Sequence, residues 1–302
     1  MERLSNRTGL KSFFCPDGIP IPVNVQEEPF LSSLLKAVII TQACLAVLIM
    51  LANTTITLTI LTTKSLQSKI YYKGIACMNT LDFLTGSISV PLFCRVGSGL
   101  LDNENKMHIC SVNRAAFTAG LILTGLTING ITFLCIERYF SICHALKYRD
   151  FFSRKKATIA SVMLIVPTVA STTMFTFGMY SECKVILTLE ILFLVVLCPI
   201  MYYRILKTIK QSVAQTQSQS SQSRRSAQQR DMSKKLILIA LVILVCFTPY
   251  GVVSNMMKNP PELRYYSLLY IALTFIEFSS VLNPMLFLLA RHIPSKRNGD
   301  LS

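Results

Sequence analysis

Tryptophan is absent from the 302-residue sequence, histidine occurs only three times, and charged residues make up 15% of the chain. Soluble domains average about 25% charged residues, so this deficit argues against a soluble globular protein. The ten cysteines include no CxxC pair, and none lies at metal-ligand spacing from a histidine, which argues against a metal site. The histidines (His108, His144 and His292) lie near the ends of apolar segments and make no catalytic cluster. We therefore expect neither a metalloprotein nor an enzyme.

Apolar residues take the place of the missing charges: 52% of the residues are hydrophobic, and the mean hydropathy is +0.50. They are gathered into runs of about 20 residues, the length that crosses the hydrocarbon core of a bilayer as a helix. Seven such runs can be assigned, at residues 33–61, 70–94, 115–139, 157–180, 185–206, 236–256 and 266–290. The pattern predicts an all-α membrane protein, folded as a seven-transmembrane helix bundle in a lipid bilayer.

The net charge of +15 is concentrated in alternate connections between the apolar runs. Cytoplasmic connections of membrane proteins carry an excess of Lys and Arg. The first, third and fifth connections and the C-terminal tail hold most of these bases, whereas the other connections contain Asp102, Glu104, Glu182 and Glu262. This distribution predicts an N-terminus outside the cell and a C-terminus inside, and it accounts for the basic charge without nucleic-acid binding.

Residues 1–30 lack the short apolar core of a cleavable signal peptide, so we expect the first apolar run to act as the targeting signal. The Gln- and Ser-rich segment 208–233 predicts a flexible inner loop. Asn6 begins an Asn-Arg-Thr glycosylation acceptor in the predicted outer tail. The expected regions are an extracellular tail at 1–32, a membrane domain at 33–290 and a short cytoplasmic tail at 291–302.

Several polar or helix-bending residues interrupt the apolar runs, where polar groups are costly and therefore indicate function. They are Asn53, Asp82, Glu137-Arg138-Tyr139, Pro249 and Asn283-Pro284. In this order and on these segments they resemble the motifs of rhodopsin-like (class A) G-protein-coupled receptors, and the resemblance covers nearly the whole chain. Cys246-Phe247-Thr248-Pro249 is similar to the family's sixth-helix hinge, and Asn283-Pro284-Met285-Leu286-Phe287 to its seventh-helix motif.

The resemblance implies that six residues of these motifs act in G-protein activation: Glu137, Arg138, Tyr139, Pro249, Asn283 and Pro284. Arg138 is a permanent cation with five hydrogen-bond donors. We expect it to pair with Glu137 at rest and then to be released toward the G protein. Pro249 removes a backbone hydrogen bond, so we expect the sixth helix to bend there and swing its inner end outward. Two departures from the family are Phe247, which replaces a tryptophan, and Phe287, which replaces a tyrosine.

The resemblance also implies a sodium site, because the family's equivalent of Asp82 binds this ion together with neighbouring polar groups. The residues that match those neighbours are Thr127, Ser279, Ser280 and Asn283. Hard cations take oxygen ligands, so the set is chemically suitable. The alternative is a protonated, hydrogen-bonded Asp82 without sodium. No other cofactor is expected.

Cysteine use departs from the family as well. Cys110 and Cys183 look like the family's outer disulfide, and we expect them to pair. The distance from Cys110 to Arg138 is 28 residues, however, and Cys15 and Cys94 are further candidates on the outer side. The pairing therefore stays open at the level of sequence.

The ligand is not identified by the sequence, although two classes can be disfavoured. The seventh apolar run contains no lysine for a retinal Schiff base, and Gly120 stands where an amine receptor carries its aspartate. Glu190 and Glu277 are expected to face the cavity and to pair with a cationic or polar ligand, unless each is protonated and bonded to a neighbouring helix. The residues expected to complete the pocket are Gly120, Thr124, Phe247, Tyr250 and Tyr270.

Taken together, the motifs predict a multi-pass plasma-membrane receptor that binds an extracellular ligand and activates a heterotrimeric G protein. A small ion or proton-coupled transporter is the first alternative, since Asp82, Glu190 and Glu277 could form a path through the membrane. Seven spans, however, do not divide into the paired inverted halves of transporters. The second alternative is a receptor-like protein that no longer signals, which Phe247 and Phe287 leave open.

Overall fold

The computed structural model describes the backbone of residues 12–16, 20–22, 25–67, 70–144, 146–148, 154–215, 238, 241–253 and 263–292. The glycosylation acceptor Asn6, most of the inner loop 208–233 and most of the tail 291–302 lie outside these residues. The fifth predicted run continues as a helix to Gln215, so residues 208–215 of the expected loop are helical.

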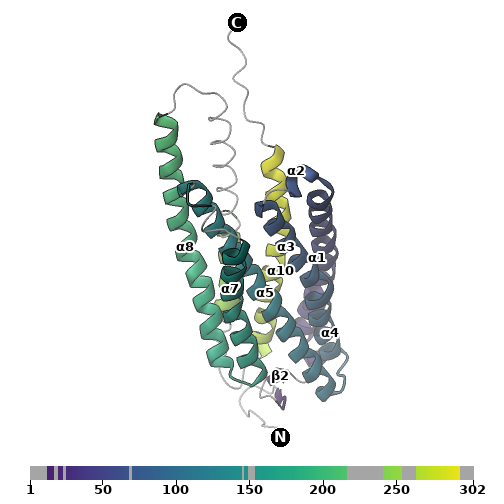
Figure 1. The fold of residues 1–302 in the computed structure, drawn as a ribbon. Coiled ribbons are helices and arrows are strands. Elements are labelled where there is room, and N and C mark those ends of the chain that lie inside the picture. Colours follow the sequence, from purple (N-terminus) through teal and green to yellow (C-terminus); the bar gives the residue numbers. More distant parts are fainter. Residues whose placement is uncertain are drawn as a thin grey trace.

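Helices make up almost all of the described chain (Figure 1). In chain order the elements are β1 Ser12–Phe14, β2 Pro20–Pro22, η1 Val25–Glu27, α1 Pro29–Thr62, α2 Lys64–Gln67, α3 Ile70–Leu84, η2 Thr85–Ser89, α4 Val90–Leu101, α5 Lys106–Cys143, α7 Arg154–Thr176, α8 Tyr180–Gln215, the helix Leu241–Val253 and α10 Leu263–His292. Five helical stretches are long and apolar enough to cross a membrane: α1, the continuous stretch Tyr72–Leu101, α5, α8 and α10. The apolar part of α7, Val162–Thr176, and the helix Leu241–Val253 are shorter. Each of the seven predicted runs therefore coincides with a helix.

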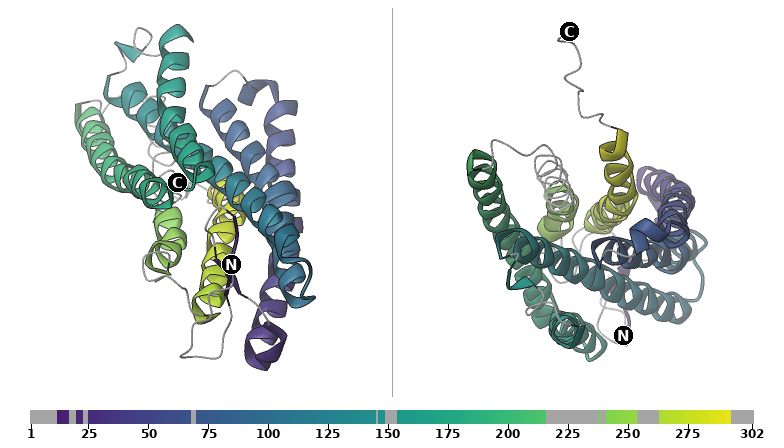
Figure 2. Two further views of the ribbon diagram at one scale, coloured as in Figure 1. Left: turned by 90° about the horizontal axis from the view of Figure 1, so that it is seen from below. Right: turned by 45° about the horizontal axis from the view of Figure 1, so that its top comes forward.

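The long, tilted α5 lies at the centre of the bundle. It packs against α3 and α4 on one side and against α7 and α8 on the other (Figures 1 and 2). Gly125 allows α7 to come close, because a Cβ at this position would lie 2.5 Å from Oγ1 of Thr168. Large apolar side chains on the outer faces of the helices, such as Leu51, Met163 and Leu192, are more than half exposed, as expected for lipid contact.

The second span contains a turn of π-helix, η2, between α3 and α4. Pro91, near the start of α4, has no backbone N–H and so cannot continue the regular hydrogen-bond ladder. Gly86 within the π turn packs against α1, and a Cβ there would lie 3.1 Å from the carbonyl oxygen of Ala46. The turn begins three residues after Asp82 and follows the helical turn that carries this carboxylate.

The two ends of the bundle are distinguished by what covers them. α2 and the C-terminal end of α10 lie at one end, and β2 lies at the other (Figure 1). The β1–β2 hairpin pairs Phe13 with Ile21, which brings the N-terminal segment to the end that the basic residues predict to be outside. This arrangement agrees with the predicted orientation.

The connection between α7 and α8 is residues 177–179, shorter than a loop that could cover the bundle. Gly178 has φ of 76°, a left-handed conformation that glycine adopts without strain. Its N–H bonds the carbonyl of Phe175, which closes the C-terminus of α7. Arg114 of α5 donates a 2.6 Å hydrogen bond to the carbonyl of Thr176 and so binds the same helix end.

The predicted Cys110–Cys183 disulfide is wrong. Cys110 pairs instead with Cys15, with a Cα–Cα distance of 5.6 Å, and Cys183 is a free, buried thiol. The reason is that α8 begins at Tyr180, so Cys183 lies in the first turn of a helix rather than in a loop. Its side chain is 4% exposed and keeps a free thiol, whereas the chain after β1 brings Cys15 to the second turn of α5.

Candidate functional site

The inner end of α5 carries a closed ion pair. Nε of Arg138 donates to Oε2 of Glu137 at 2.6 Å, and Nη2 donates to Oε1 at 2.9 Å. Both side chains are largely removed from solvent, with Arg138 11% and Glu137 1% exposed. Bidentate contact between a guanidinium and a carboxylate is the strong form of this interaction. The expected resting pair is therefore present in the structure.

Tyr148, in the connection after α5, completes this pair as a third member. Its hydroxyl donates a 2.6 Å hydrogen bond to Oε1 of Glu137. Burial, together with this bond to a carboxylate, raises the pKa of Tyr148 above its ordinary value, so the hydroxyl keeps its proton. No role for Tyr148 is predicted from the sequence motifs. A tyrosine ten residues after the motif arginine was the only available signal.

The neighbouring Tyr139 faces the same connection. Its ring meets that of His144 edge-on, with centroids 5.4 Å apart, and its hydroxyl lies 3.4 Å from Nε2 of His144. Glu137-Arg138-Tyr139 therefore holds the inner connection at two points, through Tyr148 and through His144. The sequence places these groups only a few residues apart, and the final turns of α5 bring them into contact.

In mid-membrane, Asp82 is 1% exposed and joins α3 to α10. The hydroxyl of Ser280 donates to Oδ1 at 2.8 Å, and Nδ2 of Asn283 donates to Oδ2 at 3.2 Å. Asn53 extends the contact to α1, because its Nδ2 donates to the carbonyl oxygen of Ser280 at 3.1 Å. Three helices thus meet at one buried carboxylate.

Of the four residues expected around Asp82, the structure brings Ser280 and Asn283 into contact with it and leaves two apart. The hydroxyl of Ser279 donates to the carbonyl of Ile276 in its own helix, at 2.6 Å. Thr127 is half-buried on α5, and the described residues show no hydrogen bond between it and Asp82. Two buried groups that sequence reasoning did not place in this set lie nearby: Asn53 on α1, and Asn79 on α3 itself, three residues before Asp82.

Two oxygens in this region have no hydrogen-bond partner among the described residues, although both are buried. They are Oδ1 of Asn53 and Oδ1 of Asn283. An unsatisfied buried amide oxygen is uncommon and calls for an explanation. Carboxylate and amide oxygens are the ligands that a hard cation takes. The residues present therefore fit a sodium ion chemically.

Glu190 lies in a polar contact of three helices. Oε1 accepts from Nδ2 of Asn129 on α5 and from Oγ1 of Thr168 on α7, both at 3.4 Å. Asn129 also donates to Thr168, at 2.7 Å. Glu190 is 8% exposed, and its Oε2 is buried without a hydrogen-bond partner in the described structure. The carboxyl group therefore bridges α5, α7 and α8.

Glu277 lies in a different seam, between α10 and α1. Its Oε1 accepts from Nε2 of Gln42 at 3.4 Å, and Gln42 is fully buried. The thiol of Cys94, on α4, lies 3.9 Å from Oε1 of Gln42. The two expected pocket carboxyl groups thus each accept hydrogen bonds from neighbouring helices.

The three aromatic residues predicted for the pocket lie in two apolar clusters that meet at Tyr250. Tyr270 belongs to the outer cluster and Phe247 to the inner one, and Tyr250 packs against both. Gly120 faces α4 and η2, where a Cβ would lie 3.5 Å from the Phe93 ring and from Oγ of Ser89. Thr124, one turn further along α5, is half-buried.

Both predicted hinge prolines lie inside helices. Pro249 is half-buried in the helix Leu241–Val253, and the hydroxyl of the preceding Thr248 donates to the carbonyl of Leu244 at 2.7 Å. Pro284 is buried within α10, next to Asn283. The side chain of Phe287 is outside the part of the chain that the structure describes.

Two comparisons with known proteins agree with this geometry. The family described as 7 transmembrane receptor (rhodopsin family) matches residues 52–287. The fold is similar to the crystal structure of squid rhodopsin, with a TM-score of 0.69 and 17% sequence identity, over 86% of this chain and 82% of that chain. The bundle is that of a multi-pass, seven-helix membrane protein. The chain belongs to the rhodopsin family of seven-transmembrane receptors, the class A G-protein-coupled receptors.

Proposed function

We propose that this receptor lies in the plasma membrane, binds an extracellular ligand and activates a heterotrimeric G protein. The observation that carries the proposal is the closed contact of Arg138, Glu137 and Tyr148 at the inner end of α5. Members of this family are generally not enzymes, and we propose the same for this chain.

The resting state depends on the charge balance of this contact. Glu137 is almost fully buried, so its negative charge is stable only while Arg138 and Tyr148 donate to it. Displacement of the connection that carries Tyr148 weakens the pair. Arg138 then presents its donors to the inner side, where carbonyl and carboxylate groups of a G protein can accept them.

The sixth helix supplies the movement. Pro249 cannot donate a backbone hydrogen bond, so the helix Leu241–Val253 bends there more easily than at its other residues. Outward displacement of its inner end opens the space beside Arg138 between α5 and α8. We propose that the ligand favours this open state and therefore shifts a pre-existing equilibrium.

We further propose that Asp82 holds a sodium ion in the resting state, with Ser280, Asn283 and Asn53 around it. The ion would supply the positive charge that a buried carboxylate needs and would satisfy the two unpartnered amide oxygens. Ser279, bonded to its own helix, is not part of this proposed set. The protonated Asp82 remains the alternative.

The test of the main proposal is a panel of G-protein dissociation sensors in cultured cells. The receptor is compared with Arg138→Ala at matched surface level, and with Arg204→Ala, an exposed arginine at the inner part of α8, as a control. We expect a basal or extract-stimulated signal that Arg138→Ala removes and Arg204→Ala keeps. An unchanged signal in Arg138→Ala would contradict the proposed role.

A transporter is less well supported by the geometry. The three buried carboxyl groups have separate hydrogen-bond partners: Asp82 bonds Ser280 and Asn283, Glu277 bonds Gln42, and Glu190 bonds Asn129 and Thr168. Within the described residues no recorded hydrogen bond joins these groups into a path across the membrane. The same sensor panel distinguishes a receptor that no longer signals, because such a receptor would give no G-protein response at good surface expression.

A further inference from the structure

The N-terminal segment covers the outer end of the bundle. We call β1, Cys15–Pro16, β2 and η1 the N-terminal cap; it comprises the described residues 12–16, 20–22 and 25–27. Among the described residues, one covalent bond other than the peptide chain links the cap to the bundle, the disulfide from Cys15 to Cys110 in α5. The connection between α7 and α8 is too short to lie over the bundle, so the N-terminal cap occupies that place.

Side chains of the N-terminal cap enter the protein core rather than lying on it. Ile21 is 2% exposed, Val25 1% and Cys15 4%. They belong to one apolar cluster with residues of five other elements of the bundle, among them Val253, Leu269 and Tyr270. The cap, whose η1 lies against α1 and α4, therefore belongs to the same apolar cluster as Tyr270, and Tyr250 packs against that cluster.

Two polar contacts are seen between the described residues of the N-terminal cap and the bundle. Nε2 of Gln26 donates to the carbonyl oxygen of Leu101, and the ammonium group of Lys106 lies 5.6 Å from the centre of the Phe13 ring. A single cation–π contact contributes modestly to stability. The Cys15–Cys110 disulfide and the burial of apolar side chains also attach the cap, and an apolar or amphipathic ligand can take the place of the apolar contacts.

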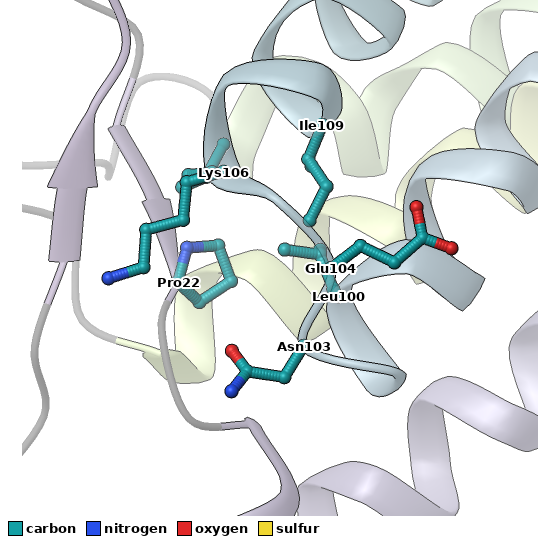
Figure 3. A pocket seen from close by; sticks show the side chains of 7 residues that line it. Pro22, Leu100, Asn103, Glu104, Lys106 and Ile109 are labelled. Carbon is teal, nitrogen blue, oxygen red and sulfur yellow. The ribbon is translucent and has the colours of Figure 1, made fainter.

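A shallow pocket marks the seam where the N-terminal cap meets the turn between α4 and α5 (Figure 3). Ile21 and Pro22 of β2 form one wall, and the other wall is formed by Leu100, Asn103, Glu104, Lys106 and Ile109. Asn103 makes the sharp turn with φ of 50°, which asparagine tolerates better than most residues. The cap thus meets the bundle along an incompletely filled seam, at which separation can begin.

We propose that the N-terminal cap is an autoinhibitory lid: it occupies the outer mouth of the receptor, and a ligand arriving from outside must displace Ile21 and Val25 to enter. The Cys15–Cys110 disulfide keeps the displaced lid tethered, so it returns when the ligand leaves. The inference rests on the proposed function only in assigning the ligand to this mouth. Closure itself is a property of the fold and can be measured without any signal.

The experiment measures access to a thiol placed under the lid. Leu269→Cys introduces this thiol on α10, in a full-length receptor with Cys94→Ala and Cys183→Ala to remove the outer free thiols. Intact cells are treated with the membrane-impermeant reagent sulfonatoethyl methanethiosulfonate. The labelling rate is read from the mass shift of the peptide that contains residue 269, so that the thiols of Cys15 and Cys110 released by reduction are not counted. The same background without Leu269→Cys gives the unspecific rate.

Three changes open the lid in different ways. Ile21→Ser removes an apolar anchor, the pair Cys15→Ser and Cys110→Ser removes the tether, and mild reduction followed by washing removes the tether without a substitution in the lid. We expect each to raise the labelling rate by roughly ten- to a hundredfold, the range that burial of one or two aliphatic side chains contributes to an opening equilibrium. Pro16→Ala changes an exposed residue of the same segment and should leave the rate unchanged. Reduction should have no effect on the variant that lacks both cysteines.

Equal labelling in all variants and before and after reduction overturns the lid, because the N-terminal cap then does not control access. Variants that misfold are recognised by lost surface expression, and the reduced Leu269→Cys receptor with an unsubstituted lid then decides the question. The two proposals fail separately. If the lid variants label faster but no G protein responds, the lid is supported and the proposed function is contradicted. If the signal depends on Arg138 but labelling is equal in all variants, the proposed function is supported and the lid is contradicted.

Discussion

The hydroxyl of Tyr148 and the guanidinium of Arg138 converge on one oxygen, Oε1 of Glu137, at 2.6 Å and 2.9 Å. The inner connection after α5 is thereby tied to the residue pair that ends this helix. Release of the connection and release of Arg138 are coupled for this reason, since each donor stabilises the charge that the other also needs.

Removing the Tyr148 hydroxyl should therefore raise basal activity. Tyr148→Phe deletes a hydrogen bond to a charged group, worth about 1.5–3 kcal/mol, and so favours release of Arg138 by roughly tenfold or more. The measurement is ligand-independent G-protein dissociation at matched surface level. Tyr203→Phe removes the same group from an exposed position on α8 and should change nothing. Equal basal signals in Tyr148→Phe and wild type would show that the bond does not hold the resting state.

Sodium should stabilise the receptor through Asp82. An ion that binds only the folded state raises its stability in proportion to the logarithm of its concentration, once the site is saturated. We expect the Tm in sodium chloride to exceed that in choline chloride by several degrees, and Asp82→Asn to abolish the difference. Ser279→Ala is the matched control, because that hydroxyl bonds Ile276 instead. A wild-type Tm that does not depend on the cation would favour the protonated carboxyl group.

Glu190 and Glu277 should behave as neutral hydrogen-bonding groups rather than as fixed charges. Glu190→Gln keeps the size of the side chain and its hydrogen bonds to Asn129 and Thr168, and should lower the Tm little. Glu190→Leu leaves those partners unsatisfied and should cost about 1–3 kcal/mol. Thermal unfolding of both variants in lipid nanodiscs gives the comparison. Glu277→Gln and Glu277→Leu test the contact with Gln42 in the same way. At either position, a Tm that falls equally for the glutamine and the leucine variant would indicate that the negative charge matters.

Cys135 on α5 and Cys198 on α8 should cross-link on oxidation. Their sulfur atoms lie 2.9 Å apart and both residues are buried. Iodine, which enters the bilayer, takes two electrons from the two thiols, giving one disulfide and two equivalents of hydrogen iodide. Peptide mapping should find the linked pair in wild type and lose it in Cys135→Ser. Failure of the linked peptide to form in fully oxidised receptor would argue against this packing of α5 and α8.

The contribution of the outer ion pair between Arg95 and Glu104 to stability should fall, and not rise, when the pH is lowered. Arg95 donates a 2.6 Å bond to Glu104 and holds the pKa of that carboxyl group below its ordinary value of 4.5. A lowered pKa contributes stability above the ordinary pKa and loses it as the pH falls through the lowered value. His108 lies 3.6 Å from the same carboxyl oxygen, so the comparison is made in a His108→Asn background. There the Tm difference between receptors with Glu104 and with Glu104→Gln should be constant from neutral pH to about pH 5 and shrink only at lower pH. Both side chains are partly exposed, so the difference should be small; a difference that grows with acidity would contradict the pairing.

Local features of this protein could be read from its sequence. The seven apolar runs all became helices, because a bilayer requires every backbone group to bond within its own segment and the length of an apolar run sets the span. The pairing of Arg138 with Glu137 also follows from sequence, since the two are adjacent. The contact of Asp82 with Ser280 and Asn283 could be predicted only from the order of the motifs and the family resemblance that they carry.

Contacts that depend on the rotation of a helix about its axis were decided by the tertiary structure. A membrane helix is apolar on nearly all sides, so its sequence gives little indication of which face turns inward. For this reason the expected cavity carboxylates Glu190 and Glu277 were found in two different seams between helices. Thr127 and Ser279, for the same reason, were found outside the contacts of Asp82.

The sequence by itself determined the number of spans and their orientation, because these depend on the hydropathy and charge of continuous segments. The class of protein followed from the resemblance that its motifs carry. Only the tertiary structure decided which cysteines pair and what covers the outer mouth. Both outcomes depend on distance in space: α8 begins early enough to carry Cys183 into a helix, and the β1–β2 hairpin brings Cys15 to Cys110. No local pattern could have shown that residues so far apart in the chain would meet.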